Sequence, residues 1–163
     1  MPIVPFDSLP PDARVWVFAA DGPLGADAQR TLLGEVDAFL SAWNAHGHPL
    51  TCGRAWRDPF FLAIGVDQST AGASGCSIDG LFRVMQRLQP VIGASMMPSG
   101  RAYWREANGD VKTGARHEFN RLVSVGAVPA PVTVFDTSIT TAADWATQFE
   151  KTRRREDEKT REK

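Results

Sequence analysis

The sequence has little of the chemistry on which most enzymes rely. Its 163 residues include two cysteines, three histidines and one tyrosine, and the formal net charge is −1. So few cysteines argue against the disulfide framework of a small secreted protein and allow at most one bond, between Cys52 and Cys76. A charge so close to zero creates no field that would recruit nucleic acid, so we expect no nucleic-acid partner.

Long hydrophobic runs and targeting signals are also missing. No apolar run approaches the ~20 residues of a membrane-spanning helix, so we expect no membrane span. The N-terminus has neither the basic nor the apolar segment of a signal peptide, which makes a soluble cytoplasmic protein the expectation. There is no GxxxxGK[ST] loop for nucleotide phosphates and no other recognised catalytic motif. We expect no cofactor, and enzymatic activity stays an open question.

What is present in the first half is an alternation of strands and helices. Runs rich in β-branched and aromatic residues predict strands over Arg14–Ala20, Leu50–Arg57, Phe60–Val66 and Arg101–Glu106. Apolar residues at helical spacing predict one helix over Ala26–His46 and another from Ile78, which Pro90 is expected to end or kink. This order is the split β-α-β-β-α-β pattern of a ferredoxin-like two-layer sandwich, an α+β fold.

The second half has a different pattern. The AsnGly pair at Asn108–Gly109 is the strongest short hairpin signal. A helix over His117–Val125, a strand over Val132–Phe135 and a helix near Thr140–Asp144 are predicted to follow. We therefore predict a ferredoxin-like unit over residues 13–98 and a small α+β module over residues 99–152. The charged residues at the C-terminal end, 153–163, are predicted to be a solvated tail.

The aromatic residues of the second half carry a resemblance. The residues concerned are Tyr103, Trp104, Asn108, Gly109, Leu122, Gly126, Val134, Phe135 and Trp145. Their order resembles that of the bacterial GYF-like domains of the GYF-2 type, although ThrGly stands at 113–114 where those domains have GlyPro. The resemblance implies a module that binds proline-rich peptides on an aromatic surface. The same rings would also pack well as an ordinary core.

A second resemblance covers the whole chain. ArgValTrpValPhe near the start, AlaTrpAsnAlaHisGly over Ala42–Gly47 and GlyAlaSerGlyCysSerIleAsp over Gly72–Asp79 are similar to segments of a set of small uncharacterised bacterial proteins. Some members are labelled ABC transporter ATPase. Because no lysine follows Gly75 to hold a phosphate, this sequence does not support that label.

The loop over Ala71–Asp79 holds the one residue with a physical reason to be reactive. Cys76 stands where a helix begins, and helix N-termini stabilise a thiolate. His46 or His48 would be the base of such a site, whereas Asp79 would oppose thiolate formation. A set of small residues, Gly72, Ser74, Gly75 and Ser77, would bind an anion or serve only to cap the helix. No ligand spacing typical of a metal site is present.

Three functions from different classes follow. The leading hypothesis is a soluble, non-catalytic binding or adaptor protein that recognises a peptide or protein partner through Tyr103, Trp104, Phe135 and Trp145. The first alternative is a cysteine-dependent enzyme or redox protein that uses Cys76 with His46 or His48. The second is an anion sensor built on Gly72–Ser77.

Overall fold

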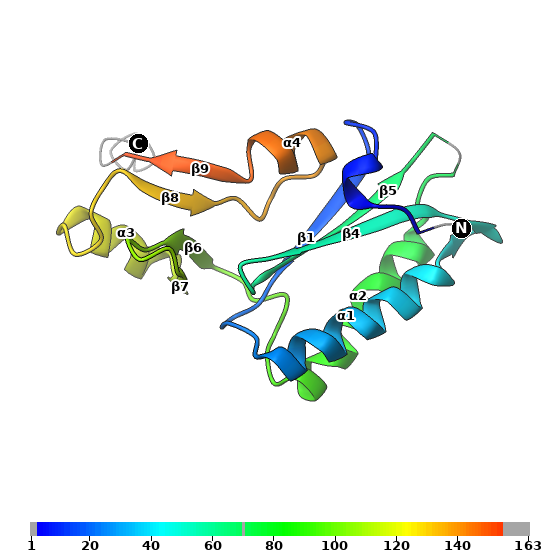
Figure 1. Ribbon diagram of the computed structural model, residues 1–163, viewed down its shortest axis with the longest axis horizontal. Helices are drawn as coiled ribbons and strands as arrows, with labels where there is room; N and C mark the ends of the chain where they lie inside the picture. The colour runs from blue at the N-terminus through cyan, green and yellow to red at the C-terminus, as the bar shows by residue number, and fades with distance from the viewer. Residues whose placement is uncertain (1–2, 70, 155–163) are drawn as a thin grey trace.

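The structure is a computed structural model that describes residues 3–69 and 71–154. It is α+β with antiparallel sheets, as the sequence predicts. Two lobes lie end to end, one with a three-stranded sheet and two long helices, the other with a four-stranded sheet and a short helix (Figure 1). Among the described residues, no helix is long and apolar enough to span a bilayer.

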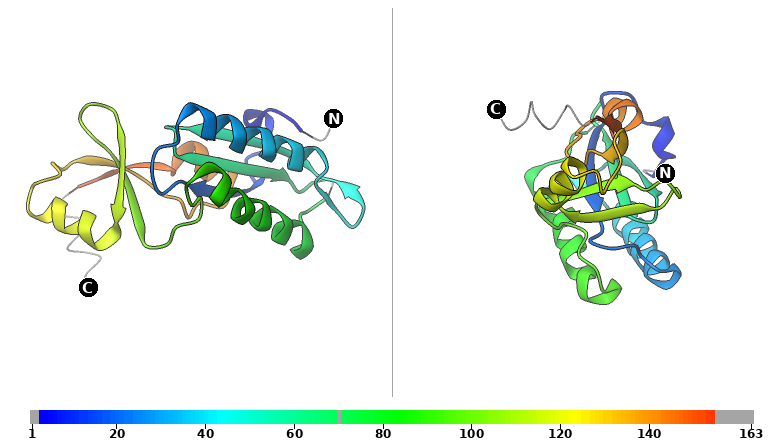
Figure 2. Two further views of the ribbon diagram at one scale, coloured as in Figure 1. Left: turned by 90° about the horizontal axis from the view of Figure 1, so that it is seen from below. Right: turned by 90° about the vertical axis from the view of Figure 1, so that its left-hand side faces the viewer.

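The first lobe is built on a sheet with the order β1-β5-β4. Its strands are β1 (Arg14–Ala19), β4 (Thr51–Arg57) and β5 (Phe61–Asp67). The helices α1 (Ala26–Ser41) and α2 (Gly75–Ile92) lie side by side over one face of this sheet (Figure 2). The central strand β5 is buried from Phe61 to Val66, because both of its edges are paired and both of its faces are covered.

The N-terminal segment covers the other face of the sheet and the start of the β4 edge, at Cys52. The backbone N–H of Val4 donates to the carbonyl of Cys52 at 2.8 Å, and the short helix η1 (Phe6–Ser8) buries Phe6. A Cβ on Gly53 would stand 2.5 Å from the Val4 carbonyl oxygen, so only glycine lets the segment approach this closely. The proline-rich start of the chain is therefore part of the packed fold.

The second lobe is a sheet with the order β7-β6-β8-β9. Its strands are β6 (Arg101–Arg105), β7 (Val111–Ala115), β8 (Val132–Phe135) and β9 (Glu150–Arg153), and α3 (Arg116–Ser124) packs on it. The predicted hairpin turn at Asn108–Gly109 is confirmed, with Gly109 at φ +93°. The helix α4 (Ala142–Thr147) turns back and contacts β1 of the first lobe.

One hydrophobic core joins the two lobes. The ring of Phe61 in the first sheet lies 5.2 Å from Tyr103 and 4.9 Å from Phe135 in the second, measured between centroids. Phe149, which is fully buried, lies 5.0 Å from Phe61. The chain passes from the first sheet to the second between α2 and β6, and the buried core includes residues of both lobes.

The predicted helix over Ala26–His46 is wrong beyond Ser41. The chain forms a two-stranded hairpin there, with β2 (Asn44–Ala45) paired to β3 (His48–Pro49). His46 at φ +51° and Gly47 at φ +81° form the two-residue turn, and positive φ at both positions is what this hairpin turn requires. Pro90 does not end α2, which continues to Ile92 and is closed by Gly93 at φ +72°.

Two segments of the second half differ from the sequence expectation. The strand predicted over Arg101–Glu106 as the last strand of the first sheet lies in the second sheet instead, because the local AsnGly hairpin pairs it with β7. The predicted tail is wrong at its first residue, since Arg153 belongs to β9, which pairs with β8 over Glu150–Arg153. Of the predicted tail over 153–163, residues 155–163 lie outside the described chain.

Candidate functional site: the open edge of β1

The structure places the predicted cysteine site on the surface. Cys76 is exposed on the first turn of α2, and neither free cysteine forms a disulfide. His46 and His48 are exposed on the β2–β3 hairpin. The hairpin is fixed near the start of α2, since the Ser77 hydroxyl donates to the Asn44 carbonyl at 2.7 Å. Within the described residues, no hydrogen bond connects the Cys76 thiol to either imidazole.

The serines of the Gly72–Ser77 loop serve the start of α2. The Ser74 hydroxyl accepts a hydrogen bond from the Ser77 N–H at 3.1 Å, and the Ser74 N–H donates to the Ser77 hydroxyl at 3.3 Å. This reciprocal arrangement is a capping box. Both hydroxyls are thus engaged within the protein. A Cβ at Gly75 would meet nothing within 4 Å, and one at Gly72 only the Gln68 side chain, so space alone does not require glycine at either position. In the described chain, no group of three or more His, Cys, Asp or Glu is placed to hold a metal ion.

The four aromatic residues predicted to bind a peptide do not form an exposed surface. Tyr103, Trp104 and Phe135 are all less than a tenth exposed. Trp104 stacks on Phe119 at 4.6 Å between centroids, and the half-buried Trp145 stacks on Phe149 at 4.2 Å. The prediction of an exposed aromatic surface is therefore wrong, because these rings fill the two hydrophobic cores of the second half.

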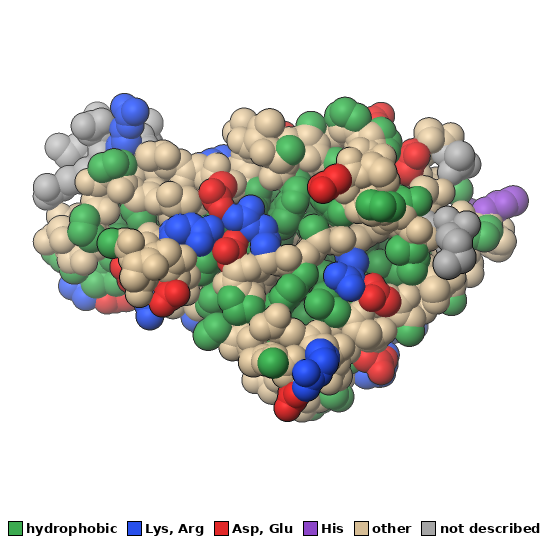
Figure 3. Space-filling view, viewed as in Figure 1, with side chains coloured by type: hydrophobic (Ala, Val, Ile, Leu, Met, Phe, Trp, Pro, Cys, Tyr) green, Lys and Arg blue, Asp and Glu red, His purple; other side chains and the backbone are tan. Residues whose placement is uncertain are grey.

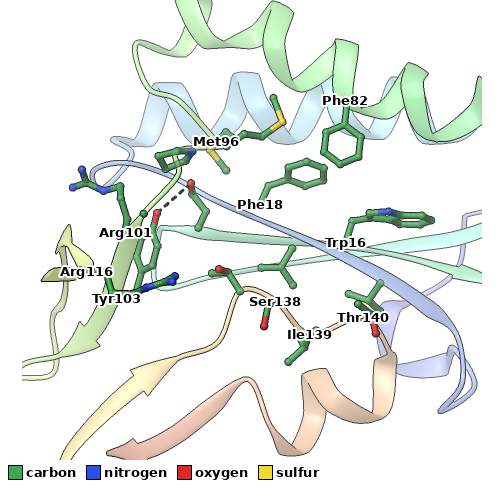
Figure 4. A pocket seen from close by; sticks show the side chains of 17 residues that line it. Trp16, Phe18, Phe82, Met96, Arg101, Tyr103, Arg116, Ser138, Ile139 and Thr140 are labelled. Carbon is green, nitrogen blue, oxygen red and sulfur yellow. Dashed lines mark hydrogen bonds between the residues drawn. The ribbon is translucent and has the colours of Figure 1, made fainter. Parts of the chain in front are cut away.

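A pocket of about 370 Å³ lies along β1, and we call it the β1 groove (Figure 4). Its floor is β1 itself, and its walls come from α2, from the link between the lobes and from the segment before α4. The lining residues are Val15–Ala19, Phe82, Met96–Pro98, Gly100, Arg101, Tyr103, Arg116 and Thr137–Thr140. The volume lies within the range of ligand-binding pockets.

The backbone of β1 explains why the groove exists. Val15, Val17 and Ala19 direct their N–H and C=O groups away from β5, towards the free edge of the sheet. The Val15 N–H donates to Thr140 at 2.8 Å, and the Ala19 N–H donates to Met96 at 3.0 Å. Between these two covered ends, the Val15 C=O and both backbone groups of Val17 have no protein hydrogen bond in the described chain.

Apolar side chains flank this open stretch of backbone. Phe18 contacts Phe82 edge to face, with centroids 5.4 Å apart, and Phe82 is 36% exposed. Figure 4 shows both rings on one side of the strand, with Ser138, Ile139 and Thr140 on the other. The open edge therefore lies in a recess with an aromatic wall and a polar wall.

Charge in the groove is of one sign. Among the residues that the structure describes, Arg101 and Arg116 are the only Lys, Arg, Asp or Glu residues that line it, and both lie at the Tyr103 end (Figure 4). Arg101 is held in place, since its Nε donates to the Thr113 hydroxyl at 3.1 Å. The Tyr103 hydroxyl donates to the Ala20 carbonyl at 2.9 Å, and burial raises the pKa of Tyr103, which keeps it a donor at neutral pH. This end of the groove is positive and rich in donors.

A second pocket, of about 320 Å³, adjoins the same end. It shares Arg101 and Arg116 with the β1 groove and adds Lys151 and Arg153. Its one carboxylate, Asp136, accepts a hydrogen bond from Lys151 at 2.8 Å. The positive character of the groove thus continues into its neighbour, with Arg116 between the two.

Of the residues in this site, Tyr103 was among those predicted to bind a partner, but the others were missed. Val17 stood only within the ArgValTrpValPhe segment, Arg101 only as the first residue of a predicted strand, and Arg116 carries no motif. One signal was available in the sequence. The segment Arg101–Glu106 was predicted to be a strand of the first sheet, and the same segment leads into the hairpin that turns at Asn108–Gly109. In the structure, β7 takes one edge of this strand and β8 takes the other, so the edge of β1 lacks its predicted partner.

Comparisons with known proteins leave the site to be interpreted on its own chemistry. No protein-family model matches the chain, and neither the curated proteins nor the solved structures contain a match to it.

Proposed function

We propose that the protein is a non-catalytic binding or adaptor protein that takes up an extended peptide segment of a protein partner along the open edge of β1. Addition of a strand to an exposed sheet edge is a common mode of peptide recognition, in which backbone hydrogen bonds supply affinity and side-chain pockets supply specificity. The proposal keeps the kind of partner expected from the sequence and moves the binding surface from the buried aromatic residues to the β1 groove.

One observation carries the proposal. Three backbone groups in the middle of β1, the Val15 C=O, the Val17 N–H and the Val17 C=O, face a recess instead of another strand. Unpaired strand edges are normally covered, charged or interrupted, because they promote unwanted pairing. Here the two ends of the edge are covered and the centre is left accessible, which suits a single narrow chain.

The fold assignment supports the same conclusion. In the split β-α-β-β-α-β pattern, the last strand lies beside the first. The order β1-β5-β4, with two helices on one face, fits such a ferredoxin-like unit without its last strand. We propose that the partner peptide occupies this vacant place. The GYF-like assignment of residues 99–152 and a cytoplasmic location remain part of the proposal.

The test begins with a library of random seven-residue peptides with free C-termini, selected on the full chain. The variant Val17→Pro removes the central N–H, and proline is tolerated at an edge position whose N–H makes no internal bond. Val17→Thr, which keeps the N–H and the branched Cβ, is the matched control. We expect the selected peptides to bind the wild type and Val17→Thr alike and to lose at least about tenfold in affinity for Val17→Pro.

Two results would overturn the proposal. One is a selection that enriches no peptide on the folded wild-type protein. The other is a set of enriched peptides that bind Val17→Pro as tightly as Val17→Thr, with both variants shown to be folded by their circular dichroism and thermal unfolding.

A further inference from the structure

Building on the proposed function, we infer that the β1 groove takes the C-terminal end of a peptide, parallel to β1, with the terminal carboxylate held by Arg101 and Arg116. The argument has three parts: the number of free backbone groups, the direction in which they can be used, and the charge at one end of the groove.

The free backbone groups limit the ligand to a short segment. Val15 and Ala19 are four residues apart in an extended strand, a span of about 14 Å. A parallel strand would donate one N–H to the Val15 C=O, accept from the Val17 N–H with the carbonyl of the same residue, and donate the N–H two residues later to the Val17 C=O. All three free groups of β1 are then paired.

The next hydrogen bond of such a strand is blocked. Its carbonyl would have to accept from the Ala19 N–H, but that donor is already bonded to the Met96 carbonyl at 3.0 Å. The Asp21 N–H is likewise bonded to the Ser95 carbonyl at 3.0 Å. A parallel strand must therefore leave the edge or end here, and a chain terminus ends here without a turn.

The charge decides between the two directions. An antiparallel strand would also pair the three free groups, but its C-terminal end would lie beside Thr140, away from both arginines. In the parallel direction the carboxylate arrives at the Ala19 end, where the Tyr103 hydroxyl lies 3.4 Å from the Ala19 carbonyl and Arg101 and Arg116 stand on either side. No carboxylate of the described residues lines the groove to compete for these donors.

The two arginines are arranged for this role in different ways. Arg101 is half-buried and held by Thr113, so little ordering is needed when it meets an anion. Arg116 is exposed, and its guanidinium has no hydrogen bond or ion pair in the described chain, while its backbone N–H donates to the Gly100 carbonyl at 2.8 Å. Figure 4 shows its side chain extending towards Tyr103. A guanidinium can bind a carboxylate through two parallel hydrogen bonds.

A second copy of this chain does not fit the open edge. Thr140 and Met96 occupy the place of a neighbouring strand at both ends of β1. Two copies would bring these flanking segments into collision before their Val17 residues could pair. The recess therefore favours a thin extended end over another folded sheet.

The test uses the most enriched peptide of the selection, made once with a free C-terminal carboxylate and once as the C-terminal amide. Fluorescence anisotropy with the full chain measures both affinities for the wild type, Arg116→Gln, Arg101→Gln and the control Arg121→Gln. Arg121 is exposed on α3, pairs with Glu118 and does not line the groove. We expect the wild type and Arg121→Gln to prefer the acid by about tenfold or more, as a charge-assisted hydrogen bond implies.

Arg116→Gln and Arg101→Gln should lose that preference, because each should bind the acid peptide more weakly and the amide peptide with unchanged affinity. A double-mutant cycle between the peptide end and each arginine isolates this effect. If acid and amide bind equally well while Val17→Pro abolishes both, the carboxylate inference is wrong and the strand-addition function stands. If both bind and Val17→Pro has no effect, the proposed function itself is wrong. Retention of the acid preference in both Arg116→Gln and Arg101→Gln would also overturn the inference.

Discussion

The two edges of the first sheet are finished in different ways. At its start, the edge of β4 is covered by the nearby N-terminal segment, with the Val4 N–H bonded to the Cys52 carbonyl and a glycine at position 53 that permits the close approach. The edge of β1 is covered only at its ends, by Met96 and Thr140 from later in the chain. The β4 edge is covered only at its start, since the outward backbone groups of Arg54 and Trp56 have no hydrogen bond in the described chain, and the β1 edge is open between its two covered ends, at Val17.

Under the proposed function, this difference separates a packed part of the sheet from an edge that binds a partner. The start of β4 is tightly packed, since Cys52 is fully buried and Gly53 has no room for a side chain. The open edge lies in a recess whose ends block pairing with another folded sheet. Proteins limit the hazard of a free strand edge by shortening or covering it, and here that protection also leaves a site for one extended chain.

The largest expected contrast is in thiol reactivity. Burial raises the pKa of Cys52 to about 11, whereas Cys76 is exposed. The thiolate is the reactive form, so at pH 8 we expect a disulfide reagent to modify Cys52 at least about a hundredfold more slowly than Cys76. Stopped-flow absorbance measures both phases, and Cys76→Ser should remove only the fast one. Rapid modification of both thiols would contradict the burial of Cys52 in the core beneath α1.

The next largest effect is expected from Gly53→Ala at the packed start of β4. Its Cβ would overlap the Val4 carbonyl oxygen at 2.5 Å, so the N-terminal segment must shift. We expect the free energy of unfolding to fall by about 2 kcal/mol, as overpacking usually costs. Urea denaturation checks this against Gly34→Ala in α1, which meets nothing within 4 Å and should raise stability by about 0.5–1 kcal/mol. Equal stability of the wild type and Gly53→Ala would contradict this tight packing.

Two prolines placed in β1 sharpen the contrast within one strand. Val15→Pro removes the N–H that donates to Thr140, while Val17→Pro removes an N–H without a protein partner. Since one hydrogen bond contributes roughly 1 kcal/mol, Val15→Pro should be the less stable variant by about that amount in urea denaturation. The same loss in both variants, or a larger one in Val17→Pro, would show that the Val17 N–H is bonded in the free protein.

The smallest effect concerns the charged cluster that fixes the second lobe, and with it the segments that frame the open edge. Arg57 and Arg105 both pair with Asp58 and with Glu150. Figure 3 shows positive and negative side chains side by side between the lobes. Burial alone would raise the pKa of Asp58, but hydrogen bonds from Arg57 and Arg105 outweigh it and lower this pKa.

A lowered pKa in the folded state stabilises the protein above the ordinary carboxyl pKa and loses that contribution as the pH falls through the folded value, here below about pH 4. Asp58→Asn should therefore cost less than about 1 kcal/mol at pH 7, because the cluster is partly exposed, and should flatten the loss of stability below pH 4. Urea denaturation across that pH range measures it, with the exposed Asp27→Asn as a control. An unchanged acid dependence in Asp58→Asn would contradict the assignment.

Local patterns were enough to predict much of the first lobe. The strands β1, β4 and β5, the start of α2 and its serine cap follow from alternation, helical spacing and the residues that favour caps. The helix near Thr140–Asp144 and the turn at Asn108–Gly109 were predicted for the same reason. In each case, residues close in sequence decide the structure.

The errors and the missed site depend on partners far along the chain. Helical spacing favours a helix that continues to His46. The chain instead turns at His46–Gly47, and the Ser77 hydroxyl of α2 donates to the Asn44 carbonyl. The strand at Glu150 exists because β8 offers an unpaired edge, which no pattern within the charged segment reveals. Met96 and Thr140 cover the two ends of the β1 edge and leave Val17 unpaired between them. Only the tertiary fold brings these distant residues to β1.

Residue-resolved amide hydrogen exchange tests the open edge most directly. In the free protein, the Val17 amide should exchange at least about tenfold faster than those of Val15 and Ala19, which are bonded to Thr140 and Met96. Addition of a selected peptide should slow Val17 to the rate of its two neighbours. A Val17 amide that is as protected as Val15 and Ala19 without any peptide would contradict an open β1 edge.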